Sequence, residues 1–189
     1  EFYTYILFHF PKSEFENLNE INVTWSQNDE HFQKWCEGNT GVPLIDAAMR
    51  YFNLTGTMHN RLRMIVSSYL TKNLLIDWKK GERYFASKLL DYEASSNIGS
   101  WQWAASTGAD AVPYFRIFNP YLQSAKFDKD AIFIKSVIPE LKDVNSKLIH
   151  SENGVQSNIF LNYPPQLVSI EFSRKRAIEE FKRANNEKY

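Results

Sequence analysis

The sequence predicts an all-α fold, and two observations support this prediction. Apolar residues recur three and four positions apart in several segments, which is the spacing that places them on one face of a helix. No run alternates apolar and polar residues with the period of two that marks a β-strand. Because no internal repeat and no Gly/Ser/Pro-rich linker interrupts the 189 residues, we expect a single domain over 1–189.

The clearest predicted helix lies between Pro43 and Gly56. Proline is favoured in the first turn of a helix and glycine directly after its end. The apolar residues between them stand at i, i+3, i+4 and i+7: Ile45, Ala48, Met49 and Phe52. They share one face, which we expect to be buried.

The same reasoning predicts further helices on both sides. The segment Glu1–Phe10 has the pattern of the inside of an amphipathic helix. Leu62, Ile65, Val66 and Tyr69 repeat the helical spacing, and Trp78, Phe85 and Leu89 do so after a plausible N-cap, Asp77. We also expect helices over about Asn97–Ser106, stopping near Gly108, and over about Val168–Ala184. Prolines punctuate the second half, so its helices should be shorter.

Composition excludes several classes of protein. A hydrophobic content of 43% with seven glycines and seven prolines is typical of a globular chain. The only cysteine, Cys36, rules out a disulfide framework, and the four histidines show no metal-ligand spacing, so we expect no metal. There is no apolar run long enough to cross a membrane and no signal peptide, which fits a reducing cytoplasm.

Charge is balanced overall but uneven along the chain. The net charge is zero, whereas Arg50–Lys88 holds eight Lys/Arg and two acids. A stripe of this kind is often just a solvated face. Because this one overlaps the segment richest in possible ligand-binding residues, we interpret it as an electrostatic footprint for phosphates.

Polar residues share one face of the helix that follows His59. Asn60, Arg63, Met64 and Ser67 lie opposite its apolar residues, and together they offer an amide, a guanidinium, a thioether and a hydroxyl. A planar guanidinium suits a phosphate or the rim of a heteroaromatic ring. The same pattern is equally typical of a solvent-facing side, and periodicity alone does not separate the two.

Two tryptophans two positions apart should point in different directions. At about 100° per residue, Trp101 and Trp103 diverge by about 200°, so one can face the interior while the other faces a cleft. Asn97 lies four residues before Trp101 and therefore on the same face. Two tryptophans can also simply anchor a core helix. Asp91 and Glu93, between two helices, offer acceptors that could hold a ligand or cap the helices.

Taken together, five blocks resemble the FAD-binding half of the photolyase/cryptochrome family, and most closely the bacterial photolyases that repair cyclobutane pyrimidine dimers. The blocks are Trp35–Arg50, Met58–Val66, Leu70–Trp78, Gly81–Phe85 and Trp101–Pro120. The resemblance covers nearly the whole chain, and its blocks are long and correctly ordered. It implies a multihelical FAD-binding domain, present here in part.

The resemblance also implies roles for individual residues. Asn97 matches the asparagine that faces the reactive nitrogen edge of the flavin ring. Asn60, Arg63, Asp91 and Glu93 match other cofactor-contacting positions. Trp101, Trp78 and Trp25 match the chain of tryptophans that carries electrons to the photoexcited flavin, although each of Trp78 and Trp25 alone reads as packing. Met64 and Trp103 match the residues that receive the flipped-out dimer, and Asn60, Arg61 and Arg116 match positions near the DNA backbone.

The family's chemistry is light-driven repair of DNA that contains pyrimidine dimers. Reduced FAD donates an electron to the dimer, the cyclobutane ring splits, and the electron returns; a damaged base is the least costly to flip out of the duplex. A second, antenna chromophore of unknown identity belongs to an N-terminal α/β domain. We expect a cytoplasmic bacterial enzyme, monomeric at full length.

This sequence departs from the family pattern at several positions. Tyr92 and Glu93 stand where Gly and Asp are usual, Thr57 where Trp is usual, and Ile98 and Ser100 where Asn and Gly are usual. The antenna domain and the upstream helices that hold the FAD phosphates are absent. We therefore expect a piece of a longer protein, inactive alone. Two alternatives stay open: a cryptochrome that signals without repair, and a helical interaction module without a cofactor.

Overall fold

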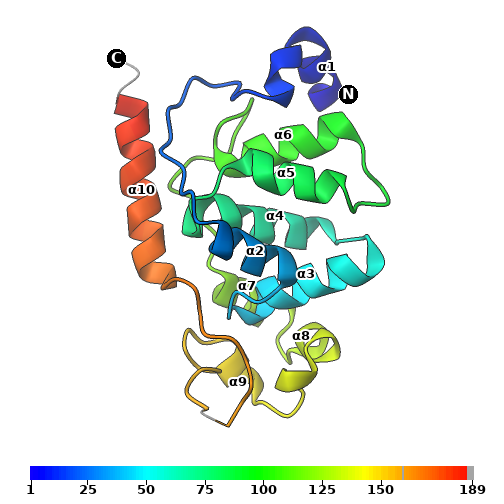
Figure 1. The fold of residues 1–189 in the computed structure, drawn as a ribbon, viewed down its shortest axis with the longest axis vertical. Helices are drawn as coiled ribbons and strands as arrows, with labels where there is room; N and C mark the ends of the chain where they lie inside the picture. Colours follow the sequence, from blue (N-terminus) through cyan, green and yellow to red (C-terminus); the bar gives the residue numbers. More distant parts are fainter. Residues whose placement is uncertain (159, 187–189) are drawn as a thin grey trace.

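All regular elements of the structure are helical, as predicted. The computed structural model describes residues 1–158 and 160–186; residue 159 and residues 187–189 of the predicted domain lie outside the described residues. Within the described ranges there is no strand (Figure 1). The α-helices are α1 (Phe2–His9), α2 (Asp29–Glu37), α3 (Pro43–Thr55), α4 (Asn60–Ser68), α5 (Trp78–Ala86), α6 (Ala94–Ala105), α7 (Pro120–Phe127), α8 (Ile132–Val137), α9 (Ser146–Ile149) and α10 (Ile170–Asn186).

Local sequence signals set the ends of the central helices. α3 has Pro43 in its first turn and ends at Gly56, whose φ of 68° is left-handed. The His59 side chain accepts a hydrogen bond from the backbone N–H of Arg61 at the start of α4, and Asp77 accepts one from Lys79 at the start of α5. These ends agree with the predicted ones.

Two predicted helices have boundaries that differ from the observed ones by up to three residues. α6 begins at Ala94, three residues before Asn97, because the Glu93 carboxylate accepts hydrogen bonds from the backbone N–H groups of Ser95 and Ser96. It ends at Ala105 with Ser106 in the left-handed conformation, before Gly108. α10 runs over Ile170–Asn186 and so starts two residues later than predicted.

Several elements were not predicted: the sequence predicts no range for α2, α7, α8 or α9, nor for the following turns. Two 3-10 turns, Pro11–Glu14 and Pro139–Leu141, are common connectors, but α4 continues directly into a π-helical turn over Tyr69–Asn73. This turn is completely buried. At α1, by contrast, the helix forms as predicted but none of its side chains is buried.

The core is built around tryptophan rings at the centre of the helical stack. Trp35 of α2 is fully buried and packs with its ring centroid 6.1 Å from Phe85 and 6.1 Å from Trp101. α5 and α6 approach each other closely because position 81 is a glycine: a Cβ there would overlap the ring of Trp101. This contact fixes α6, the helix that carries Asn97 and both neighbouring tryptophans.

A smaller cluster attaches α10 to the side of the stack (Figure 1). The Lys72 ammonium lies 3.4 Å from the ring centroid of Phe181 and donates to the Ala105 carbonyl at 3.0 Å. Burial lowers the pKa of Lys72 well below its ordinary value. The ring face and the negative end of the α6 dipole both favour the cation and act against that shift.

None of the helices in the described ranges has the combination of length and hydropathy that a membrane span requires.

Candidate functional site

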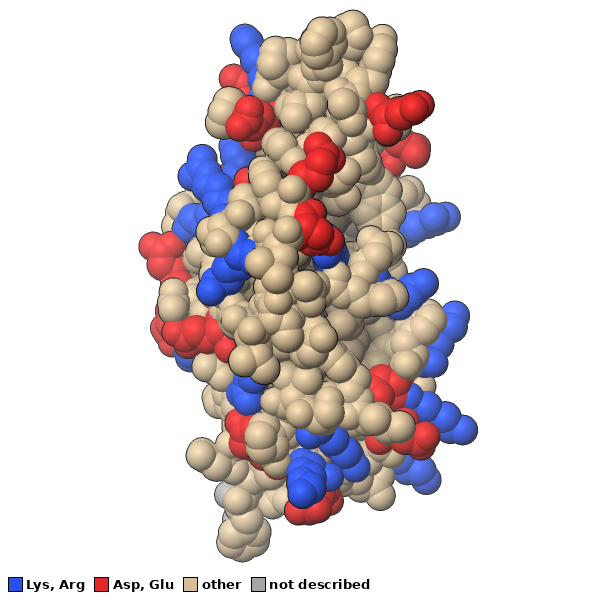
Figure 2. All heavy atoms as spheres, turned by 90° about the vertical axis from the view of Figure 1, so that its right-hand side faces the viewer, with Lys and Arg blue, Asp and Glu red and all other residues tan. Residues whose placement is uncertain are grey.

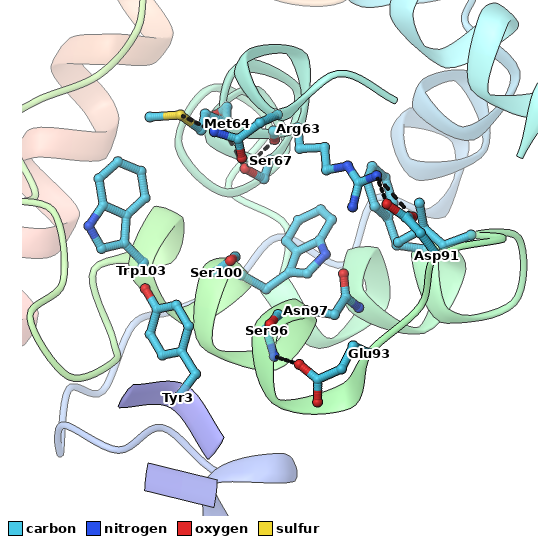
Figure 3. Close-up of a pocket in the computed structure, with 14 residues that line it drawn as sticks. Tyr3, Arg63, Met64, Ser67, Asp91, Glu93, Ser96, Asn97, Ser100 and Trp103 are labelled. Atoms are coloured by element: carbon cyan, nitrogen blue, oxygen red, sulfur yellow. Dashed lines mark hydrogen bonds and ion pairs between the residues drawn. The ribbon is translucent and has the colours of Figure 1, made fainter. Parts of the chain in front are cut away.

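A cavity of about 320 Å³ opens between α4, α6 and the start of the chain (Figure 3). The polar face of α4 lines one side of the cavity. It contributes the four residues that the sequence predicted to share one helix face: Asn60, Arg63, Met64 and Ser67. The other side is formed mainly by α6, through Ser96, Asn97, Ser100, Trp101 and Trp103. Tyr3, Phe85, Leu89, Asp91 and Glu93 complete the lining.

An ion pair holds the guanidinium at one end of the cavity. Arg63 Nη2 donates to both carboxylate oxygens of Asp91, at 2.9 and 2.8 Å, and Arg63 Nε donates to the Met58 carbonyl at 2.7 Å. The pair is partly exposed, so its contribution to stability is at most about 1 kcal/mol. Its structural effect is greater, because it ties α4 to the loop before α6 and holds the plane of the guanidinium.

Glu93 acts as the N-cap of α6. The carboxylate receives hydrogen bonds from the Ser96 N–H at 2.8 Å and the Ser95 N–H at 3.0 Å. Hydrogen bonds from the serines, that of the Ser96 side chain first, lower the pKa of Glu93 to about 2. Of the two roles open for this residue, capping is the one that the contacts support, and the anion lies at the rim of the cavity (Figure 3).

The amide of Asn97 is held by α5. Its Nδ2 atom donates to Glu82 Oε1 at 3.0 Å and to the Glu82 carbonyl at 3.5 Å, and its oxygen points into the cavity (Figure 3). Glu82 was not among the predicted site residues. It lies within the Gly81–Phe85 block, but only the packing of α5 against α6 brings it to Asn97.

The two tryptophans diverge as their spacing predicts. Trp101 is only 3% exposed and meets Phe85 edge-on at 5.2 Å, whereas Trp103 is half-buried and lies on the open side of the cavity with Met64 (Figure 3). The cavity therefore has an aromatic wall with one indole anchored in the core and one accessible to a ligand.

The other predicted electron-transfer residues lie away from the cavity. Trp78 is buried, and its Nε1 donates to Asn17 Oδ1 at 2.8 Å. Trp25 is half-buried against Phe181, with the ring centroids 6.0 Å apart. The indole in ring contact with Trp101 is that of Trp35. The relay of Trp101, Trp78 and Trp25 stays a prediction.

The predicted DNA-contacting arginines are not gathered at the cavity. The guanidinium of Arg61 lies over the Phe127 ring at 4.1 Å and lines a second cavity of about 700 Å³ on another side of α4. Arg116 is exposed and lies in the connection between α6 and α7. Both assignments stay predictions.

The basic stripe is not a continuous positive surface. Four of its eight cations form ion pairs (Arg50, Arg63, Lys79 and Lys80), and Lys72 is buried. Lys/Arg and Asp/Glu side chains are interspersed on the face shown in Figure 2. The whole stripe is therefore not available as a footprint for phosphates, because half of its cations are paired with carboxylates and Lys72 is buried.

The cavity suits a planar aromatic ligand with a polar edge. Indole and phenyl rings offer stacking surfaces, and the Asn97 oxygen offers a hydrogen-bond acceptor. Arg63 is the one cation of the described lining, against the acids Asp91 and Glu93. The lining thus fits the ring of a flavin, but it offers few donors for a pyrophosphate. Among the described residues no group of His, Cys, Asp or Glu could hold a metal ion.

The fold and the cavity define the class of protein: a helical domain with a cavity that suits an aromatic ligand. The chain matches the model of the "FAD binding domain of DNA photolyase" over residues 1–183. It therefore belongs to the photolyase FAD-binding domain family, which confirms the resemblance seen in the sequence.

Its relatives include proteins named as photolyases and a cryptochrome. A deoxyribodipyrimidine photo-lyase of Buchnera aphidicola from Acyrthosiphon pisum is 50% identical; the match covers 97% of this chain and 39% of the relative. The structure of a class III photolyase from Agrobacterium tumefaciens superposes with a TM-score of 0.90 at 40% identity, over 98% of this chain and 40% of that one. A Synechocystis cryptochrome gives 0.85 at 34%, over 94% and 39%. The chain thus spans about two fifths of their length.

Proposed function

We propose that this chain is part of the catalytic domain of a deoxyribodipyrimidine photolyase, which uses light and reduced FAD to split cyclobutane pyrimidine dimers in DNA. The observation that carries the proposal is the cavity between α4 and α6, which joins an oriented amide oxygen to an aromatic wall. The names of the relatives support it.

The residues of the cavity divide into two groups under this proposal. Asn97, Arg63 and Asp91 hold the flavin ring and its polar edges, and Glu93 fixes the helix that carries Asn97. Met64 and Trp103, on the open side, receive the flipped dimer, because an indole face and a thioether stack well on a base. When FAD is bound it supplies the electron.

The remaining roles concern electron supply, DNA and the rest of the protein. Trp25, Trp78 and Trp101 carry electrons from the surface to the flavin. Asn60, Arg61 and Arg116 contact the DNA backbone. A second chromophore belongs to another domain of the longer protein, which we propose to be a cytoplasmic bacterial monomer.

The test is an absorbance spectrum of the longer protein followed by a repair assay. We expect a bound-flavin spectrum and light-dependent loss of dimers from an oligonucleotide that contains one thymine dimer. The same reaction in the dark is the control. A purified protein without flavin would contradict the proposal and favour the interaction module.

A cryptochrome is the second candidate, since a cryptochrome shares this fold. Flavin binding and photoreduction without any repair of the dimer would favour it. Asn at position 97 and the Met58–Met64 block favour repair, because they match the repair enzymes in the family resemblance.

A further inference from the structure

We propose that Phe127 is a positioning residue for DNA binding: its ring holds the guanidinium of Arg61 beside the ammonium of Lys126, and the two cations bind one phosphate of the DNA backbone. This inference rests on the proposed function, under which Arg61 contacts DNA, and it adds Lys126 as a second contact. Phe127 acts through the two cations and does not itself touch the phosphate. The cations come from different helices, α4 and α7, so only the packed molecule brings them to one ring.

Two cations lie beside one aromatic ring. The guanidinium carbon of Arg61 is 4.1 Å from the centroid of the Phe127 ring, and the Lys126 ammonium is 5.3 Å from the same centroid. At both distances the negative face of an aromatic ring attracts a cation. Because this attraction falls with distance, the ring holds Arg61 more firmly than Lys126.

Stacking on the ring occupies the flat face of the Arg61 guanidinium and leaves its edge available. The N–H donors of a guanidinium lie in its plane, where they match the oxygens of a phosphate. In the part of the chain that the structure describes, the Arg61 guanidinium has neither a hydrogen-bond acceptor nor an ion-pair partner. A guanidinium already held in one orientation also loses less conformational entropy when it binds a ligand.

The positive charge beside this ring is not neutralised locally. Among residues 1–158 and 160–186, no carboxylate forms an ion pair with Arg61 or Lys126. The next residue, Asp128, accepts hydrogen bonds from the N–H groups of Phe133 and Ile134, in the first turn of α8. The C-terminal end of α7 contributes only about half of one negative charge. Two like charges at one ring therefore favour a bound anion, and a phosphodiester is the anion that DNA presents.

The first test examines the stacking in the 189-residue chain without DNA. Protons above the face of an aromatic ring have upfield NMR shifts, so the Hδ signals of Arg61, assigned with the variant Arg61→Ala, report the contact. We expect the upfield shift to disappear in Phe127→Leu and to persist in Phe127→Tyr, which retains the ring. Phe172→Leu, which replaces an exposed phenylalanine of α10, should leave the shift unchanged. Absence of the shift in the wild-type chain, with folding verified by circular dichroism, overturns the positioning role.

The second test measures DNA binding by the longer protein in a double-mutant cycle. Phe127→Leu should weaken binding about two- to fivefold, for damaged and intact DNA alike, because a phosphate contact carries no sequence information. The same substitution should have no further effect in the Arg61→Ala/Lys126→Ala background, where the ring has no cation to hold. Equal weakening in both backgrounds would show that Phe127 only supports the fold, and the proposal would fail.

Salt dependence decides whether the two cations share one phosphate. The slope of log K against log salt falls by about 1 for each phosphate contact that is lost. We therefore expect Arg61→Ala/Lys126→Ala to lower the slope by about 1 in total. A decrease of about 2 would mean that the cations bind two separate phosphates, and would overturn the shared site.

The tests separate the inference from the proposed function. If the longer protein binds neither damaged nor intact DNA, the proposed function fails, and the NMR shift of Arg61 still decides whether Phe127 positions it. If DNA binding is unchanged in Arg61→Ala/Lys126→Ala, the inference fails, while flavin binding and light-dependent repair still decide the proposed function.

Discussion

Trp78 is the residue whose two proposed roles are easiest to separate. It is buried and donates to Asn17, and it lines neither the cavity nor its rim. In the longer protein we expect Trp78→Phe to block photoreduction of oxidised flavin, because phenylalanine is much harder to oxidise than tryptophan. Repair by chemically pre-reduced enzyme should be nearly unchanged.

The two readouts for Trp78→Phe are transient absorbance and the yield of dimer repair. Trp103→Phe is the matched control, since that indole lies in the cavity and should affect dimer binding instead. Loss of repair by pre-reduced Trp78→Phe would show that Trp78 supports the fold or the lesion and is not a relay residue.

For individual residues, the sequence predicted which site residues lie together when they share one helix. It did not predict contacts between site residues on two different helices. Asn60, Arg63 and Met64 meet because they are three and four positions apart on α4, and periodicity is sufficient to place them. Glu82 and Asn97 are fifteen positions apart on different helices. Their contact depends on how α5 packs against α6, which no local pattern encodes.

Among the elements, α6 depends most clearly on one side chain. The Glu93 carboxylate satisfies two N–H groups of its first turn, so Glu93→Ala should reduce the free energy of unfolding by about 1 kcal/mol at pH 7. The pKa of Glu93 is lowered from 4.5 to about 2, so its contribution is complete above pH 4.5 and is lost as the pH falls through 2.

Urea unfolding of the wild-type chain and Glu93→Ala across this pH range would check the prediction. The difference between the two should shrink steadily below pH 4.5. Glu37→Ala, at the end of α2, is a control that removes a carboxylate from a helix without removing an N-cap. A difference that does not depend on pH would mean that packing, and not the charged cap, is responsible.

Element boundaries show where propensity gives way to tertiary structure. α3 has strong signals at both ends, Pro43 and Gly56, and its predicted limits hold. The π-helical turn Tyr69–Asn73 has no sequence signal of its own. It contains Lys72, whose ammonium reaches the end of α6 and the Phe181 ring of α10, and these partners are separated from it by 33 residues or more along the chain.

For the whole molecule, the charge of the cavity predicts weak cofactor binding by the 189-residue chain alone. Arg63 is already paired with Asp91, and Glu93 adds a further negative charge at the rim. The two phosphates of FAD need several preorganised donors, and the described lining does not supply them. Titration of the purified chain with FAD, followed by flavin fluorescence, should show no saturable quenching. Saturation at low micromolar FAD would refute this division of the pocket.

Because the net charge of the chain is zero, we expect DNA binding to depend on individual arginines and not on the overall charge. Arg116 is exposed and outside the cavity, so Arg116→Ala in the longer protein should weaken binding to damaged and intact DNA alike. We expect the slope of log K against log salt to fall by about 1. Lys175→Ala on α10, whose charge is paired with Glu171, is the control. An unchanged slope would remove Arg116 from the interface.

The close approach of α5 and α6 at Gly81 has a consequence for how this pocket can change. The two helices can lie this close only because the side chain at position 81 is a hydrogen atom. Any larger group there would overlap the Trp101 ring. On its opposite side α6 meets Tyr3 at Gly99, where a methyl group would overlap the phenol. A helix confined on both flanks has little freedom to shift sideways. The ligand preference of the cavity can therefore be changed more easily through side chains that line it, such as Ser100, than through a shift of the α6 backbone.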